Sequence, residues 1–142
     1  MADNFVLISI HPEHVVKILS GEKKLEFRRR WTTKKVDSLV IYETSPTQKI
    51  VAIANVKTIY RGTKSRLWEL SKIKGGGISR ARLFEYIGTR SEGVAIELSK
   101  IITLGNNGLS PAAIFGEGFH PPQSFRYIKE NELKKLEIYI GE

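Results

Sequence analysis

A carboxylate among three cations lies near the start of the chain, and such a group could bind an anion. Glu26 stands between Lys24, Arg28 and Arg30, a few residues after a glycine, Gly21. Lysine and arginine donate charge-assisted hydrogen bonds to phosphate and carboxylate oxygens, and a carboxylate beside them stays ionised. The spacing therefore indicates an anion-binding site.

The apolar pattern predicts a helix and then a strand around these residues. Pro12 is expected in the first turn of a helix over 12–20, and Gly21 ends it because glycine adopts positive φ at little cost. From 25 to 31 the apolar residues alternate, which predicts a strand. One face of that strand is entirely charged: Lys24, Glu26, Arg28 and Arg30. A solvated face with surface ion pairs is the alternative, since such pairs contribute only about 0–1 kcal/mol.

The charge distribution favours a polyanionic partner. The chain has 142 residues, a net charge of +8 and a pI near 9.8. Residues 17–35 and 57–90 carry the whole positive surplus. If the fold brings these segments together, they form one basic surface, which suits RNA or another phosphate-rich ligand. The length and the 41% hydrophobic content fit a single domain over 1–142.

The composition also excludes several kinds of site. There is no cysteine, so disulfides, thiol nucleophiles and thiolate metal sites are excluded. Among the histidines, His11, His14 and His120, only the pair at i, i+3 has a metal-ligand spacing, and we expect a helix-start or surface role for that pair. We predict no metal and no cofactor. No apolar run approaches the roughly 20 residues of a membrane span, so we expect a soluble cytoplasmic protein without a membrane partner.

The order of elements predicts an α+β fold. Strands alternate irregularly with short helices, which favours a curved or closed mixed sheet over a doubly wound one. The expected strands are 5–10, 25–31, 36–43, 50–60, 93–98 and 136–140, and the expected helices are 12–20, 64–72, 79–87 and 110–115. The helices on either side of Gly75-Gly76-Gly77 form either a DNA-binding helix-turn-helix or a flap over a cleft.

Three stretches resemble one family. Gly21-Glu22-Lys23-Lys24-Leu25-Glu26-Phe27-Arg28 is similar to the G-x-K-x-x-E-x-R signature of the ASCH domain family in the PUA-like superfamily. Ile8-Ser9-Ile10-His11-Pro12 and Pro121-Pro122-Gln123-Ser124-Phe125-Arg126-Tyr127 resemble stretches of single-domain prokaryotic or viral ASCH proteins. The resemblance implies a PUA-like mixed β-barrel with flanking short helices. It also implies a cleft that binds RNA or a nucleotide-like ligand.

The resemblance also suggests residue roles. By position, Lys23 and Arg28 hold the anion, Glu26 faces the ligand, and Gly21 permits the turn that brings Lys23 over the cleft. We add three residues of the basic strand and the C-terminal stretch to the candidate ligand-binding set: Arg30, Ser124 and Arg126.

Two alternative functions remain open at this point. Some ASCH proteins are reported as amidohydrolases of acetylated cytidine, and others have been proposed as ribonucleases. The first alternative is therefore hydrolysis of a modified nucleoside or of RNA through Lys23 and Glu26. Glu26 stands where the amidohydrolase branch carries a threonine nucleophile. That branch also carries a second carboxylate near the region that Gly75-Gly76-Gly77 occupies in this chain. Both differences argue against amidohydrolase chemistry. The second alternative is a DNA-binding regulator that uses residues 64–88.

Overall fold

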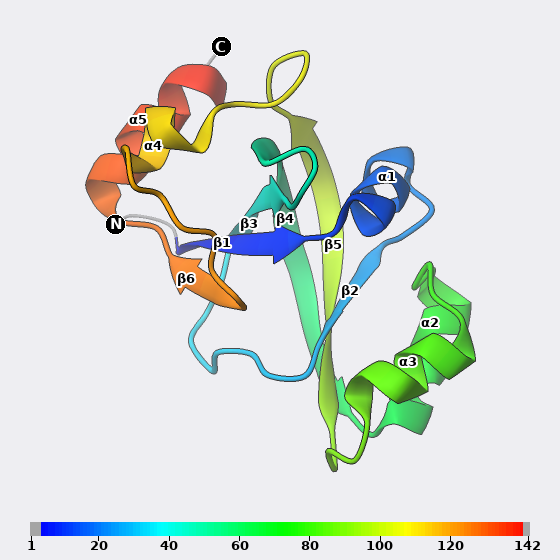
Figure 1. The fold of residues 1–142 in the computed structure, drawn as a ribbon. Coiled ribbons are helices and arrows are strands. Elements are labelled where there is room, and N and C mark those ends of the chain that lie inside the picture. The colour runs from blue at the N-terminus through cyan, green and yellow to red at the C-terminus, as the bar shows by residue number, and fades with distance from the viewer. Residues whose placement is uncertain (1–3, 141–142) are drawn as a thin grey trace.

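The fold combines one mixed sheet with short helices at its ends and faces (Figure 1). The computed structural model describes residues 4–140. Within that range the strands are β1 Phe5–Ile10, β2 Leu25–Arg28, β3 Ser38–Glu43, β4 Lys49–Gly62, β5 Gly93–Thr103 and β6 Phe125–Tyr127. The helices are α1 Pro12–Ser20, α2 Lys64–Lys74, α3 Arg80–Ile87, α4 Pro111–Phe115 and α5 Glu130–Ile140. The predicted α+β class is confirmed.

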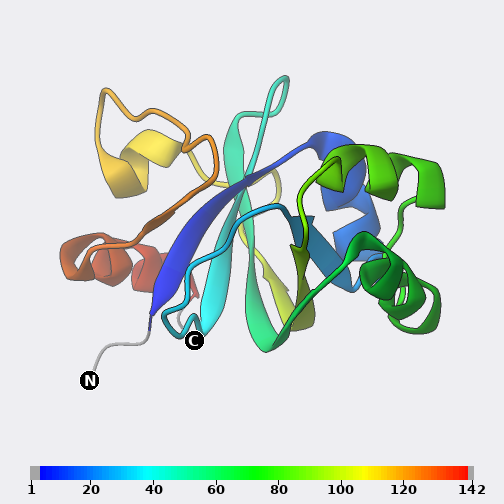
Figure 2. The same cartoon turned by 90° about the horizontal axis from the view of Figure 1, so that it is seen from below.

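The six strands form a single sheet in the order β2-β5-β4-β3-β1-β6. β1 runs parallel to β3, and the other pairs are antiparallel. The sheet twists and curls into a half-barrel, as the two views in Figures 1 and 2 show. Because β2 and β6 stand at the two ends of the strand order, the predicted mixed barrel is an open one.

Three apolar clusters fix the helices to the sheet. The first joins α1 to β1, β3, β4 and β5 through residues such as Val15 and Ile18. The second lies under α4 and α5, where Ile114 and Leu136 are fully buried. The third packs α2 and α3 against β2 and β5, with Leu67 and Leu83 buried. The helix pair α2–α3 is therefore part of the packed structure beside β2.

The predicted strand over 136–140 is wrong, because these residues form the end of α5. Leu136, Ile138 and Ile140 alternate as in a strand, but Leu133 and Leu136 also have a helical spacing and both are buried. Ile138 is 75% exposed, so the alternation has no buried face to support it. Packing against the sheet thus selects the helical period over the period of two.

The strand predicted over 25–31 is shorter than expected. β2 ends at Arg28, and Arg29 and Arg30 are exposed in the connection to β3. Trp31 is buried, and the centres of its ring and the Phe125 ring lie 4.7 Å apart. Only residues up to Arg28 pair with β5, so the alternation of faces stops there. No helix within residues 4–140 has the length and apolar character needed to cross a membrane.

Candidate functional site

A cleft of about 710 Å³ opens between the end of β1, β2, α3 and the segment before β6. Lys23, Glu26 and Arg28 all line it, so the structure places the three residues of the predicted anion site around one hollow. Its other lining residues are Ser9, Ile10, His11, His14, Phe27, Arg29, Thr44, Ile78, Arg82, Glu85, Tyr86, Pro121, Pro122 and Gln123. The cleft thus combines several cations with aromatic and apolar walls.

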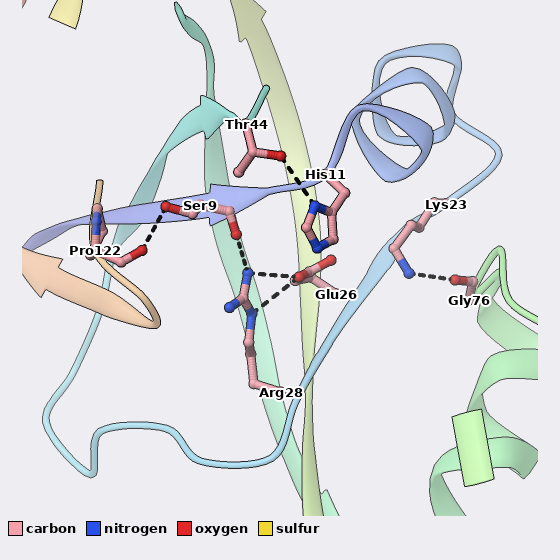
Figure 3. Close-up of polar contacts among 8 residues, drawn as sticks. All are labelled: Ser9, His11, Lys23, Glu26, Arg28, Thr44, Gly76 and Pro122. Atoms are coloured by element: carbon pink, nitrogen blue, oxygen red, sulfur yellow. Dashed lines mark hydrogen bonds and ion pairs between the residues drawn. The ribbon is translucent and has the colours of Figure 1, made fainter. Parts of the chain in front are cut away.

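Glu26 and Arg28 form an ion pair on β2 (Figure 3). The Nε and Nη2 atoms of Arg28 lie 3.1 and 3.0 Å from Oε2 of Glu26. Nη2 also donates to the backbone oxygen of Ser9 at 2.7 Å, which ties β2 to β1 across the cleft. The two side chains are only 12% and 8% exposed. The guanidinium is therefore fixed in place, and Nη1 has no partner among residues 4–140.

Lys23 is held by the glycine turn between α2 and α3. Its side chain is buried, with the residue only 3% exposed, and Nζ donates to the backbone oxygen of Gly76 at 2.7 Å (Figure 3). Nζ also lies 5.0 Å from the centre of the Phe27 ring. Burial lowers the pKa of Lys23, while the charge of Glu26 acts in the opposite direction. The turn thus presents a desolvated cation at the wall of the cleft.

The helix end that precedes Lys23 forms as predicted. Gly21 follows α1 with φ of 88°, and its amide donates to the carbonyl of Ile18. This left-handed conformation is one that glycine adopts without strain. The amides of Lys24 and Leu25 then both donate to the carbonyl of Gly75. These backbone bonds attach the start of β2 to the α2–α3 turn.

Two histidines that we had placed at a helix start or on the surface also line the cleft. Nδ1 of His11 lies 3.1 Å from the hydroxyl of Thr44 (Figure 3). Nδ1 of His14 is buried and has no partner within the described part of the chain. Burial, and then the charge of Lys23, lower the pKa of His14 below 6.5, although Glu26 partly opposes them. The spacing of His11 and His14 at i, i+3 could have indicated this site from the sequence, because β1 ends beside them.

Helix α3 closes one side of the cleft and is attached to α1 there. Arg82 donates from Nη1 and Nη2 to the two carboxylate oxygens of Glu13, at 2.8 and 3.3 Å. The guanidinium of Arg29 lies 5.2 Å from the centre of the Tyr86 ring. We expected the basic helix pair that contains Arg82 to contact phosphates, but only the tertiary fold places Arg82 and Tyr86 in the lining of this cleft. The helix pair forms a fixed wall at this position.

The remaining predicted ligand residues lie outside the cleft lining. Gly21 acts through its backbone at the end of α1, Arg30 is exposed in the connection after β2, and Ser124 is exposed beyond the lining residue Gln123. Arg126 pairs with Glu132 at 3.0 and 2.9 Å and covers the ring of Phe115. Its guanidinium therefore serves to attach β6 to α5.

The sequence and the fold both define the class of this protein. Residues 8–98 match the profile of the ASCH domain, so the chain belongs to the ASCH domain family. It is 27% identical over 131 residues to an ASCH domain-containing ribonuclease of Zymomonas mobilis, covering 92% of this chain and 88% of that protein.

The solved structures agree with this assignment. The crystal structure of ASCH from Zymomonas mobilis superimposes with a TM-score of 0.83 at 26% identity, covering 93% of this chain and 92% of that one. A mutant of the same protein gives the same TM-score at 25% identity, with 93% and 95% of the two chains covered. The curled sheet and its helices are thus the ASCH fold.

Proposed function

We propose that this protein binds single-stranded RNA in the cytoplasm, with one nucleotide unit in the cleft. The observation that carries the proposal is that Lys23, Glu26 and Arg28 border a hollow of about 710 Å³. Ligand sites of proteins commonly enclose about 300–1,000 Å³. The relative from Zymomonas mobilis is named a ribonuclease, which favours RNA as the ligand.

The chemistry of the walls suits a nucleotide unit of a single strand. The free Nη1 of Arg28 can donate to a phosphate oxygen, with Lys23 and Arg82 close enough in the lining to add positive potential. The lining also includes Tyr86 and Ile78, which offer flat and apolar surface to a base. Bases that are splayed out of a single strand can enter such a hollow, whereas stacked bases in a duplex cannot.

The direct test is a fluorescence anisotropy titration with a labelled single-stranded RNA of about ten nucleotides. We expect saturable binding whose affinity falls as salt rises, with a log–log slope of about −2 if three phosphates are contacted. A Lys135→Gln variant, which removes an exposed charge on α5 away from the cleft, should bind like the wild type. Absence of binding would contradict the proposal, and preference for duplex DNA would support the DNA-binding alternative.

A second candidate function is cleavage of the bound RNA, and His14 favours it. Its imidazole lines the cleft with a buried, unpartnered Nδ1, beside the charges of Lys23 and Glu26. In this candidate reaction the 2′ oxygen attacks phosphorus as His14 takes its proton, and the bond to the 5′ oxygen breaks as that oxygen takes a proton from water. The product is a cyclic phosphate. Lys23 and Arg28 stabilise the charge on phosphorus, and Glu26 positions Arg28.

Cleavage through His14 has a defined pH dependence. A base must be neutral, so the cleavage rate should rise with pH across the acid side of about 6.5 and level off by neutral pH. His14→Gln should lower the rate about a hundredfold at unchanged RNA affinity, and His120→Gln, at an exposed position, should leave both unchanged. Cleavage of a labelled strand is followed by gel electrophoresis. Equal rates for His14→Gln and the wild type would reject this role.

A further inference from the structure

A second hollow lies where the connection between β2 and β3 crosses β4. It has a volume of about 410 Å³ and is lined by residues 32–37 of the connection and 56–59 of β4, together with Arg61. Its cations come from both segments: Lys34, Lys35, Lys57 and Arg61. Asp37 is its only acidic lining residue within the described chain. Hydroxyl groups of Thr32, Thr33 and Thr58 add neutral hydrogen-bond donors. The composition of this hollow suits phosphate oxygens.

Several contacts hold the backbone of this hollow. Trp31 is buried against Phe125, and the hydroxyl of Thr32 is hydrogen-bonded to that of Tyr127. Nη2 of Arg61 donates to the backbone oxygen of Thr32 at 2.8 Å, which joins the connection to β4. The amide of Val56 donates to the carbonyl of Asp37 at 2.9 Å. The cations are thus mounted on a rigid frame and need little ordering when a ligand binds.

The lysines of the hollow keep most of their charge available. Lys35 lies 3.5 Å from Asp37, but its side chain is 82% exposed. Lys57 lies 3.9 Å from Glu97 with a side chain that is 63% exposed. Nζ of Lys34 covers the ring of Tyr127 at 5.6 Å and has no acidic partner among residues 4–140. Exposed ion pairs of this kind are weak, so a phosphate can displace or share them.

The connection itself links the two hollows. Arg28 and Arg29 line the cleft, Arg30 is exposed after them, and Lys34 and Lys35 line the second hollow. The chain from Arg29 to Lys34 spans at most about 17 Å, which a short stretch of nucleic acid can cover. Here the two basic segments of the sequence meet, because Lys57 and Arg61 belong to the second segment. Cations of the two basic segments thus share one hollow.

We propose that the second hollow is a phosphate subsite for the RNA strand whose nucleotide occupies the cleft. The ligand is then a strand of several nucleotides that runs along 29–35, and a free nucleotide is too short to use both sites. This inference rests on the proposed RNA binding, and it adds the length of the ligand and the direction in which the strand leaves the cleft. Arg30, which lies outside the cleft lining, gains a role as a backbone contact between the two sites.

The test compares two ligand lengths in one variant. Lys34→Gln/Lys57→Gln removes two exposed charges and leaves Arg61, which supports the connection, in place. The variant should bind a single strand of about ten nucleotides about tenfold more weakly, with a salt slope that is shallower by about 1.4. Its affinity for a dinucleotide should stay unchanged. Lys134→Gln/Lys135→Gln on α5 removes the same charge from another surface and should affect neither ligand.

The outcomes separate this inference from the proposed function. If the longer strand binds the Lys34→Gln/Lys57→Gln variant as tightly as the wild type, the second subsite is rejected while RNA binding in the cleft stands. Equal losses for the dinucleotide and the longer strand also reject it, because the charges would then act on the cleft at a distance. If the wild type binds neither RNA, the proposed function fails first. A thermal unfolding midpoint equal to that of the wild type will show that the variant retains its fold.

Discussion

Replacement of Arg28 by glutamine is expected to lower the free energy of unfolding by about 2–4 kcal/mol and to weaken RNA binding at least about tenfold. The side chains of Arg28 and Glu26 are 12% and 8% exposed, so removal of the guanidinium leaves a largely buried carboxylate without its cation. The hydrogen bond from Nη2 to the carbonyl of Ser9 is lost as well, so the end of β1 loses this contact with β2. Urea unfolding measures the first effect and anisotropy titration the second.

A double variant separates stability from binding. Glu26→Gln/Arg28→Gln removes both charges of the pair, so it should regain most of the stability that Arg28→Gln loses. Its RNA affinity should stay low, because the phosphate donor is still missing. Glu26→Gln alone keeps the donor and should bind RNA at least as tightly as the wild type. Recovery of RNA binding in the double variant would show that Arg28 acts only on the fold.

Alanine at Gly76 is expected to destabilise the protein by about 1–3 kcal/mol and to weaken RNA binding. A Cβ atom at this position would lie 1.9 Å from Oγ and 2.8 Å from Cβ of Ser71, and 3.0 Å from Cε2 of Phe27. Ser71 is buried in α2, so neither neighbour can move away freely. The turn must shift, and the Gly76 carbonyl that holds Nζ of Lys23 shifts with it. Thermal unfolding and anisotropy titration measure the two effects.

Gly21→Ala is the matched control for that change. Gly21 has φ of 88°, but a Cβ atom there would meet nothing within 4 Å. The substitution therefore introduces backbone strain of about 1 kcal/mol without a steric clash. It should lower the unfolding temperature slightly and leave RNA affinity close to that of the wild type. If Gly21→Ala weakens RNA binding as strongly as Gly76→Ala, the position of the Gly76 carbonyl is not the cause.

Features that depend on neighbouring residues could be predicted from the sequence. The helix end at Gly21 follows from a local backbone requirement, and the strand start at Leu25 follows from the change in apolar period. Alternation along that strand also puts Glu26 and Arg28 on one face, where they pair. The signature spacing identified the ASCH family for the same reason, since it encodes a turn and a strand that lie next to each other in the chain.

Local sequence patterns could not select the secondary structure where one segment fits more than one period. Leu136, Ile138 and Ile140 follow the strand period, whereas Leu133 and Leu136 follow the helix period, and only the burial of Leu133 and Leu136 selects α5. The alternation from 25 to 31 continues in the sequence beyond Arg28, but pairing with β5 ends there. Arg30 therefore lies exposed in the connection after β2 and outside the paired strand.

The sequence by itself determined the α+β class and a Glu26–Arg28 pair, because turns, caps and alternation act over a few residues. Its resemblance to the ASCH signature added the family and Lys23. Only the tertiary structure decided which distant side chains complete the cleft: His11 and His14 at the start of α1, and Arg82 and Tyr86 on α3. Their positions depend on how β1 pairs with β3 and how α3 packs beside β2. Such long-range packing leaves no periodic trace in the chain, so it must be seen in three dimensions.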